Sequence, residues 1–174
     1  IREMTGNDYL GQPTNGVLKK LDISGATIVE GGEMYVDADE VWSSHGSYAH
    51  WGGDYFHFNT QQNVLGNAMF AGCEKLGEIV LPQSITSIGN LAFFDCMNLE
   101  SLVIPDNVSS IGEDVFVECN KLSGVSVAEG NQTFSAPANC NVLMEGTTLR
   151  YAFANSVIPE GTTVIGPNAF KRYS

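Results

Sequence analysis

The sequence predicts a single α/β-type repeat solenoid, mostly β, with 23-residue coils, short parallel strands and short 3₁₀ or turn segments. Three observations predict this class. One pattern of apolar residues recurs every 23 residues, a proline follows each of the clearest predicted strands, and 19 glycines and 6 prolines among 174 residues supply frequent turns without low complexity. Because one coil cannot bury its apolar side alone, stacked coils share a continuous core.

The composition limits the possible functions. A chain of 174 residues with 43% apolar content is long enough for one domain with a substantial core, and this content argues against disorder. No apolar stretch approaches the roughly 18–20 residues that a membrane helix needs. The net charge of −12 repels nucleic acid and anionic membranes. We therefore expect no nucleic acid among the partners and no membrane insertion within this chain.

The repeat is clearest in two consecutive copies, whose residues agree in type at nine positions. The first copy contains Phe70, Cys73, Leu76, Ile79, Leu81, Pro82, Ile85, Ile88 and Gly89. The second contains Phe93, Cys96, Leu99, Leu102, Ile104, Pro105, Val108, Ile111 and Gly112. A third copy starts at Phe116 and departs after Val127, and partial copies stand at both ends of the chain.

Each coil is predicted to contain the same elements in order. Residues 79–81 alternate in, out, in, as a half-buried strand does, and the proline that follows ends the strand because it cannot donate to a ladder. Ile85 and Ile88 then turn inward, Gly89 allows a positive φ at the corner, and Phe93 fills the interior from a short turn or 3₁₀ segment. The parallel strands of this right-handed solenoid are predicted near residues 21–23, 79–81, 102–104, 125–127 and 156–158.

Cysteine recurs at the spacing of the coil. Cys73, Cys96 and Cys119 are each 23 residues apart, so their side chains point the same way, toward the core, rather than at one another. We interpret them as a ladder of small buried hydrophobes. Disulfide or zinc use is the alternative, and no CxxC pair or neighbouring histidine supports it. Cys140 falls outside the register.

Two insertions interrupt the single domain of residues 1–174. An aromatic and acidic insertion covers residues 30–63, and a second insertion covers residues 135–155. Within the second, residues 141–151 predict a small hairpin with a turn at Glu145-Gly146, which we interpret as a decorative excursion. Function in solenoids tends to lie on the strand face or on insertions, so the first insertion is the stronger candidate.

The first insertion contains both tryptophans of the chain. Its candidate ligand-binding residues are Trp42, Tyr48, Trp51 and Tyr55. Exposed tryptophan and tyrosine offer rigid apolar faces with a polar edge, which suit stacking on sugars or anchoring of a protein partner. The structural alternative is that these aromatic side chains pack over the side or end of the solenoid as a satellite cluster.

A metal-dependent or enzymatic site in the same insertion is a further alternative. Its candidate ligands or acid–base groups are His45, His50, His57 and Asp54, and its candidate calcium ligands are Asp37, Asp39 and Glu40. The insertion has no HExxH motif, no calcium-loop pattern and no nucleophile elbow around its serines. We therefore predict no enzymatic activity, no catalytic residues, no metal and no cofactor.

The outward-facing strand residues form a second candidate surface. It comprises Asp22, Val80, Val103 and Ser126, with Lys20, Glu78 and Ser101 beside them. This mixed, mildly apolar strip is either a recognition surface for an extended partner or the ordinary β-branched surface of a sheet, and we favour the ordinary interpretation.

The text FAGCEKLGEIVLPQSITSIGNLAF (70–93) and AFFDCMNLESLVIPDNVSSIGEDVF (92–116) resembles the BspA-like leucine-rich repeat family of bacterial surface proteins. The text VLKKLDISGATIVEGG (17–32) resembles the first repeat of such proteins from gut and oral Bacteroidetes. The resemblance implies a leucine-rich-repeat-like solenoid, a cell-surface or secreted location, a role in adhesion or recognition, and no catalytic residues. The chain is expected to be a fragment of a longer array.

These observations predict a non-enzymatic binding or adhesion module at the bacterial surface or in a secreted protein. Its expected partner is a host or bacterial surface protein or a glycan, held on a rigid repeat surface with little ordering cost. The negative charge favours basic patches on the partner and salt-sensitive association. The alternatives are a purely architectural spacer of a larger surface protein and a metal-dependent or enzymatic module built on residues 30–63.

Overall fold

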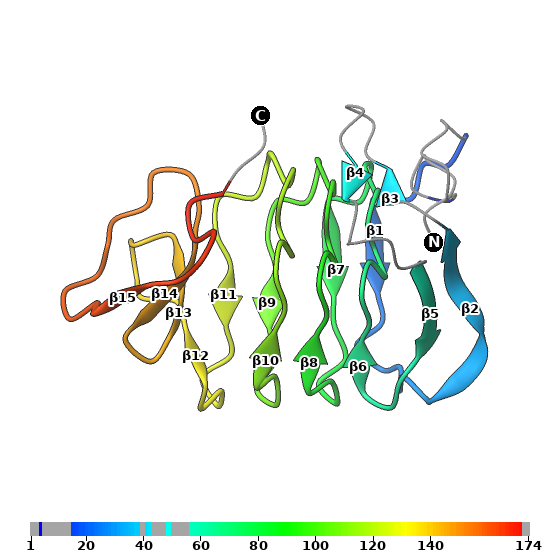
Figure 1. The fold of residues 1–174 in the computed structure, drawn as a ribbon, viewed down its shortest axis with the longest axis horizontal. Coiled ribbons are helices and arrows are strands. Elements are labelled where there is room, and N and C mark those ends of the chain that lie inside the picture. The colour runs from blue at the N-terminus through cyan, green and yellow to red at the C-terminus, as the bar shows by residue number, and fades with distance from the viewer. Residues whose placement is uncertain (1–3, 5–14, 39–40, 43–47, 50–55, 172–174) are drawn as a thin grey trace.

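The computed structural model describes residue 4 and residues 15–38, 41–42, 48–49 and 56–171. Their regular structure consists of short strands, β1 to β15. Figure 1 shows the coils side by side along the long axis, with the strands of successive coils aligned. The predicted repeat solenoid, mostly β, is confirmed. No helix in these described ranges has the length and apolar character needed to cross a membrane.

The first parallel ladder follows four of the five predicted strands. Its members are β1 (Lys20–Asp22), β7 (Glu78–Val80), β9 (Val103–Ile104) and β11 (Ser126–Val127). Strand β1 pairs with β7, strand β9 pairs with β11, and a bridge between Glu78 and Ser101 joins the two pairs. Each strand lies within one residue of its predicted position because inward and outward residues alternate along it.

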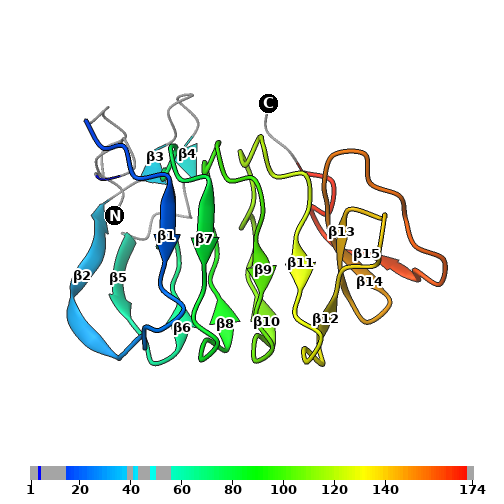
Figure 2. The same ribbon diagram turned by 180° about the vertical axis from the view of Figure 1, so that it is seen from behind.

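A second parallel ladder lies on another side of each coil. Strand β8 (Ser87–Ile88) pairs on one side with β6 (Val64–Leu65) and on the other with β10 (Ser110–Ile111). Figure 2 shows both ladders from behind. The inward residue of each strand is buried, as predicted for Ile88, but two residues are too few for an alternation to be read from the sequence.

The fifth predicted strand, residues 156–158, is wrong. These residues have no strand partner, and the last strand of the chain is β15 (Val164–Ile165). The N–H of Val157 donates to the carbonyl of Cys140 at 2.8 Å, so this segment runs beside the second insertion instead of beside β11. The side chains of Val157 and Ile158 are therefore 58% and 52% exposed.

The predicted hairpin is present in the second insertion. Strand β13 (Val142–Glu145) pairs antiparallel with β14 (Thr148–Ala152), and the turn is Gly146-Thr147, one residue later than predicted. Strand β12 (Phe134–Ser135) pairs with β13, and β15 pairs in parallel with β14. The hairpin is thus the centre of a four-stranded sheet.

The interpretation of this hairpin as a decorative excursion is wrong. Leu143 belongs to the main core and is fully buried, and Leu149 is fully buried in a second cluster. The guanidinium of Arg150 donates to the carbonyl of Ile111 at 3.0 Å, and the hydroxyl of Tyr151 donates to the carbonyl of Gly112. The hairpin therefore packs on the preceding coil and extends its core.

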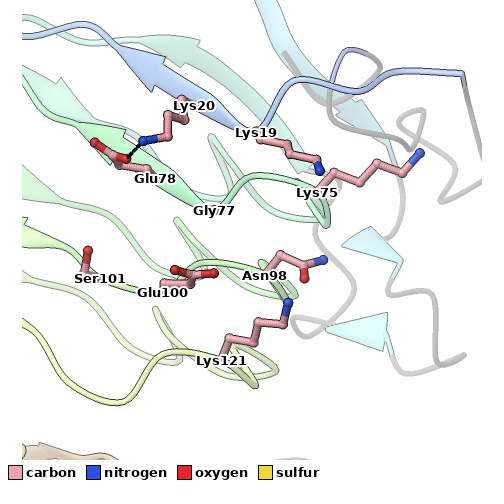
Figure 3. A pocket seen from close by; sticks show the side chains of 9 residues that line it. All are labelled: Lys19, Lys20, Lys75, Gly77, Glu78, Asn98, Glu100, Ser101 and Lys121. Carbon is pink, nitrogen blue, oxygen red and sulfur yellow. Dashed lines mark ion pairs between the residues drawn. The ribbon is translucent and has the colours of Figure 1, made fainter.

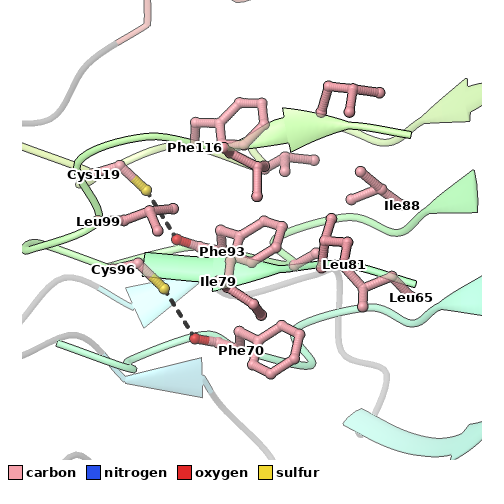
Figure 4. Close-up of a cluster of buried hydrophobic side chains, with 14 of the residues drawn as sticks. Leu65, Phe70, Ile79, Leu81, Ile88, Phe93, Cys96, Leu99, Phe116 and Cys119 are labelled. Atoms are coloured by element: carbon pink, nitrogen blue, oxygen red, sulfur yellow. Dashed lines mark hydrogen bonds between the residues drawn. The ribbon is translucent and has the colours of Figure 1, made fainter. Parts of the chain in front are cut away.

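The core repeats with the coil (Figure 4). The rings of Phe70 and Phe93 stack with centroids 5.5 Å apart, and those of Phe93 and Phe116 stack at 6.2 Å. The thiol of Cys96 donates to the carbonyl of Phe70 at 3.1 Å, and that of Cys119 donates to the carbonyl of Phe93 at 3.0 Å. These cysteines are present as buried thiols, which confirms the predicted ladder.

The corner glycine has a different role from the predicted one. Positive φ occurs two residues later, at Leu91 (57°), and Gly89 itself is not in that region. A Cβ at Gly89 would lie 2.6 Å from the backbone nitrogen of Asn67 and 2.8 Å from the carbonyl carbon of Gly66 in the preceding coil. Glycine is required here because two backbones approach each other closely.

Alkaline pH is expected to destabilise the fold. Burial raises the pKa of the Cys96 thiol well above its usual range and raises the pKa of Tyr151 to about 12. As the pH rises, the unfolded state loses these protons first, which favours unfolding. The contribution of these two groups should be constant up to about pH 8 and then fall by about 1.4 kcal/mol per pH unit for each group that titrates only in the unfolded state.

Urea unfolding from about pH 8 to about pH 11, with a reductant present, measures this fall. The variant Tyr151→Phe is the control. Its free energy of unfolding should lack the part of the fall that tyrosine titration causes from about pH 10, and should keep the fall that begins at lower pH with the thiol. A free energy of unfolding that stays constant across this range would contradict the prediction.

Candidate binding surfaces

The first insertion forms two pairs of antiparallel strands in the described residues. Strand β2 (Gly31–Ala38) pairs with β5 (Phe56–Thr60), and β3 (Val41–Trp42) pairs with β4 (Tyr48–Ala49). Figures 1 and 2 place these strands at the N-terminal end of the stack. Phe58, another aromatic residue of this insertion, packs on a small buried cluster beside the main core. That cluster consists of Ala68, Ala71, Leu91, Phe94 and Val117.

The structure places two of the four candidate ligand-binding residues. Trp42 and Tyr48 lie opposite each other in the register of β3 and β4. Trp51 and Tyr55 lie outside the described residues. The backbone thus brings two of the four together, and their role in binding stays a prediction.

The metal alternative depends largely on residues that the structure does not describe. His57 lies opposite Asp37 in the register of β5 and β2. Outside the described residues lie His45, His50, Asp54, Asp39 and Glu40. Within the described part of the chain, no three His, Cys, Asp or Glu residues are grouped so as to hold a metal ion.

The first ladder presents an outward surface, here named the strand strip. One row contains Lys20, Glu78 and Ser101, and the next contains Asp22, Val80, Val103 and Ser126. All seven side chains are exposed, and Val80 and Val103 are 40% and 54% exposed, as the alternation along each strand predicted. The strip is therefore accessible to a partner along four coils.

A groove of about 450 Å³ adjoins the beginning of these strands (Figure 3) and is here named the lysine groove. Its lining consists of three rows of equivalent residues from consecutive coils. The rows are Lys75, Asn98 and Lys121; Lys19, Gly77 and Glu100; and Lys20, Glu78 and Ser101. Because the last row also belongs to the strand strip, the groove and the strip form one continuous surface.

Gly77 leaves the floor of the groove without a side chain. Its N–H donates to the carbonyl of Lys19 at 2.8 Å, and its carbonyl accepts from the N–H of Glu100 at 3.1 Å. A Cβ at Gly77 would meet only the carbonyl oxygens of Asn98 and Lys19, each at an ordinary contact distance of 3.5 Å. Packing therefore does not demand glycine here, in contrast to Gly89.

The lysines of the groove differ in how they are held. The ammonium of Lys20 lies 2.5 Å from the carboxylate of Glu78, whose hydrogen bond and negative charge raise the pKa of Lys20. The ammonium of Lys75 donates to the carbonyl of Gly16 at 3.0 Å. Lys19 and Lys121 are exposed and form no ion pair with any residue that the structure describes. The ammonium groups of Lys19, Lys75 and Lys121 are thus available to an anion.

Comparison with known proteins supports the repeat assignment. The sequence model of the BspA type leucine-rich repeat region matches in six copies over residues 47–174. The chain belongs to the BspA-type leucine-rich repeat family. No match is found among curated proteins.

Several solved structures are similar to this BspA-type chain. The pneumococcal vaccine antigen PcpA is 24% identical over 60% of the chain and 28% of its own, with a TM-score of 0.50, and it supports the fold. A leucine-rich cell surface protein from Faecalibacterium prausnitzii is 29% identical over 52% of the chain and 24% of its own, with a TM-score of 0.45. A leucine-rich repeat protein from Eubacterium ventriosum is 21% identical over 60% and 35%, also with a TM-score of 0.45. The matched part spans about a quarter to a third of these proteins.

Sequence reasoning missed most of the lysine groove of this BspA-type solenoid. The sequence predicts Lys20, Glu78 and Ser101 only as part of the strand strip, and it does not single out Lys19, Lys75 or Lys121. The available signal was the repeat itself, because Lys75 and Lys121 each follow a core cysteine by two residues and lie two 23-residue periods apart. Writing the sequence in columns of one coil places both lysines in one column.

Proposed function

We propose that the chain is a non-enzymatic binding module of a bacterial surface or secreted protein, and that the strand strip and the lysine groove contact a protein or glycan partner. The observation that carries this proposal is the groove. Four of the eight basic residues line it, in a chain whose net charge is −12. A local field opposite to that of the whole molecule is typical of a surface that selects and orients an anionic partner.

The stacked coils explain how such a surface would work. Each strand of the strip is hydrogen-bonded to its neighbour, and the core beneath it is stacked and buried. A partner therefore meets a surface whose backbone is already ordered, so binding carries a small entropic cost. The surface or secreted location is part of the proposal and is supported by membership of the BspA-type family.

The aromatic insertion is a second candidate surface for the same function. The pairing of β3 with β4 favours it, because the backbone sets Trp42 opposite Tyr48. Trp51 and Tyr55 complete the set that the sequence predicts. The two surfaces share no residue, so variants can separate the contribution of this surface from that of the lysine groove.

A binding screen tests the proposal. The purified chain is applied to immobilised glycans and extracellular-matrix proteins, together with two variants, Lys19→Gln/Lys121→Gln and Trp42→Ala/Trp51→Ala, each checked for folding by circular dichroism. We expect the unmodified chain to bind at least one target and the lysine variant to bind it about tenfold or more weakly, because charge-assisted contacts are lost.

The variants assign the surface. Loss of binding in the tryptophan variant alone would move recognition to the aromatic insertion and contradict the role of the groove. The absence of any target for the unmodified chain would contradict a binding function and favour an architectural spacer.

A further inference from the structure

We propose that the lysine groove binds an acidic polysaccharide, a linear sugar polymer that carries sulfate or carboxylate groups. This inference rests on the proposed function and adds the chemical class of the ligand. Three features carry it: the state of the lysines, the polar lining between them, and their spacing along the stack.

The lysines supply the anion-binding part of the groove. Lys19 and Lys121 are exposed and have no ion-pair partner among the described residues, and Lys75 contacts only a neutral carbonyl. Each ammonium has three N–H donors, so each keeps donors for a sulfate or carboxylate. Lys20 is neutralised by Glu78 and contributes less.

The remaining lining suits hydroxyl groups. It contains Asn98, Glu100 and Ser101, and the described residues of the lining include no apolar side chain and no aromatic ring. The amide nitrogen of Asn98 donates to the carbonyl of Glu74 at 2.6 Å, which leaves its oxygen as an acceptor. Glu100 also accepts, and sugar hydroxyls are donors that satisfy such acceptors. A ligand with both anions and hydroxyls therefore matches the whole groove.

An acidic peptide matches this lining less well. Its carboxylates bring no donor to Glu100 and are repelled by it, whereas an acidic sugar carries hydroxyl donors beside each anionic group. A peptide that adds a strand needs an open sheet edge. Strand β7, beside the groove, is already paired with β1 on one side and bridged to Ser101 on the other.

The spacing of the lysines suits a polymer. Equivalent residues of neighbouring coils are about 4.8 Å apart, so Lys75 and Lys121, two coils apart, are separated by about 10 Å at the backbone. A linear chain with an anionic group at intervals can contact both lysines at once. The second contact is then intramolecular, which raises the affinity.

Calorimetric titration of the folded chain tests the assignment. The probes are heparin oligosaccharides for sulfate, polygalacturonate oligosaccharides for carboxylate, uncharged dextran, and poly-L-glutamate as the acidic peptide. We expect one or both acidic polysaccharides to bind, more weakly at about 0.5 M than at about 0.05 M NaCl, and dextran and poly-L-glutamate not to bind. Binding of heparin alone would assign sulfate as the recognised group, and binding of polygalacturonate alone would assign carboxylate.

Three variants locate the site. Lys19→Gln/Lys121→Gln should weaken polysaccharide binding about tenfold or more. Gly77→Leu should do the same without a charge change, because it adds a bulky side chain at a lining residue whose Cβ would make only ordinary contacts. Gln83→Glu/Gln132→Glu is the matched control, since it changes the net charge by the same amount at exposed residues outside the groove and should leave the affinity within about twofold.

The outcomes separate this inference from the proposed function. Equal loss in the glutamine-to-glutamate control would overturn the groove as the site, and binding of poly-L-glutamate alone would overturn the polysaccharide in favour of a peptide. If no acidic sugar binds but the screen finds a target that depends on the lysines, the ligand class is overturned and the proposed function survives. If neither experiment finds a ligand, both are overturned.

Discussion

Replacement of Gly112 by alanine is expected to lower the free energy of unfolding by about 3 kcal/mol, at the upper end of the usual cost of overpacking a well-packed site. A Cβ at this position would lie 2.6 Å from the backbone nitrogen of Asn90 and 2.8 Å from the carbonyl carbon of Gly89. It would also overlap the side-chain oxygen of Asn90, which accepts the N–H of Glu113 at 2.8 Å. The clash is mainly with backbone, so rotation of a side chain cannot relieve it.

Thermal unfolding measures this effect. At about 2–4 °C per kcal/mol for a chain of this size, Tm should fall by about 6–12 °C. Gly124→Ala is the matched control, because the nearest atom to its Cβ would be 3.6 Å away and its φ is not in the left-handed region. That variant should be neutral or slightly stabilising, since alanine restricts the unfolded chain. Equal Tm values for the two variants would show that the coils can move apart at Gly112.

Replacement of Phe93 by alanine is expected to cost about 3–5 kcal/mol. Phe93 is fully buried and lies between Phe70 and Phe116 in the stacked ladder. The substitution removes the central ring, so both neighbouring rings lose a partner and a cavity remains in the middle of the core. Relaxation is limited because the coils are hydrogen-bonded on more than one side.

The chain provides its own control for this prediction. Phe170 occupies the equivalent repeat position near the C-terminal end of the described residues, where it is 54% exposed. Phe170→Ala should therefore change the free energy of unfolding by less than about 1 kcal/mol. Urea unfolding of both variants compares them directly. Similar losses of free energy in the two variants would contradict the prediction, because they would mean that burial of the ring between two stacked neighbours adds no stability.

Much of the fold was predictable because its signal is local. Alternating inward and outward residues located four of the five predicted strands of the first ladder, and the spacing of Cys73, Cys96 and Cys119 predicted a buried column of thiols. The error at residues 156–158 arose because the repeat pattern was continued across an insertion. Residues 156–158 keep the apolar pattern of a strand, but in the stack they lie beside Cys140 instead of beside β11.

The sequence indicates a candidate site only where the residues of that site are close together along the chain. Sequence reasoning favoured Trp42, Tyr48, Trp51 and Tyr55 because clustered aromatic residues stand out along a chain, and that proposal awaits its test. The lysine groove did not stand out, because its basic residues are scattered along the sequence. They meet only when successive coils are stacked.

The sequence by itself determined the period of the coil, the position of four strands of the first ladder and of the hairpin, and many residues of the core. These properties follow from which side chains avoid water, and each residue type has that preference independently of its neighbours. The tertiary structure decided which coils are neighbours. That choice makes glycine necessary at Gly89 and Gly112, brings the hairpin of residues 142–152 into the core, and gathers four lysines on one face of an acidic molecule. Contacts between coils depend on distances across the stack, which no local pattern encodes.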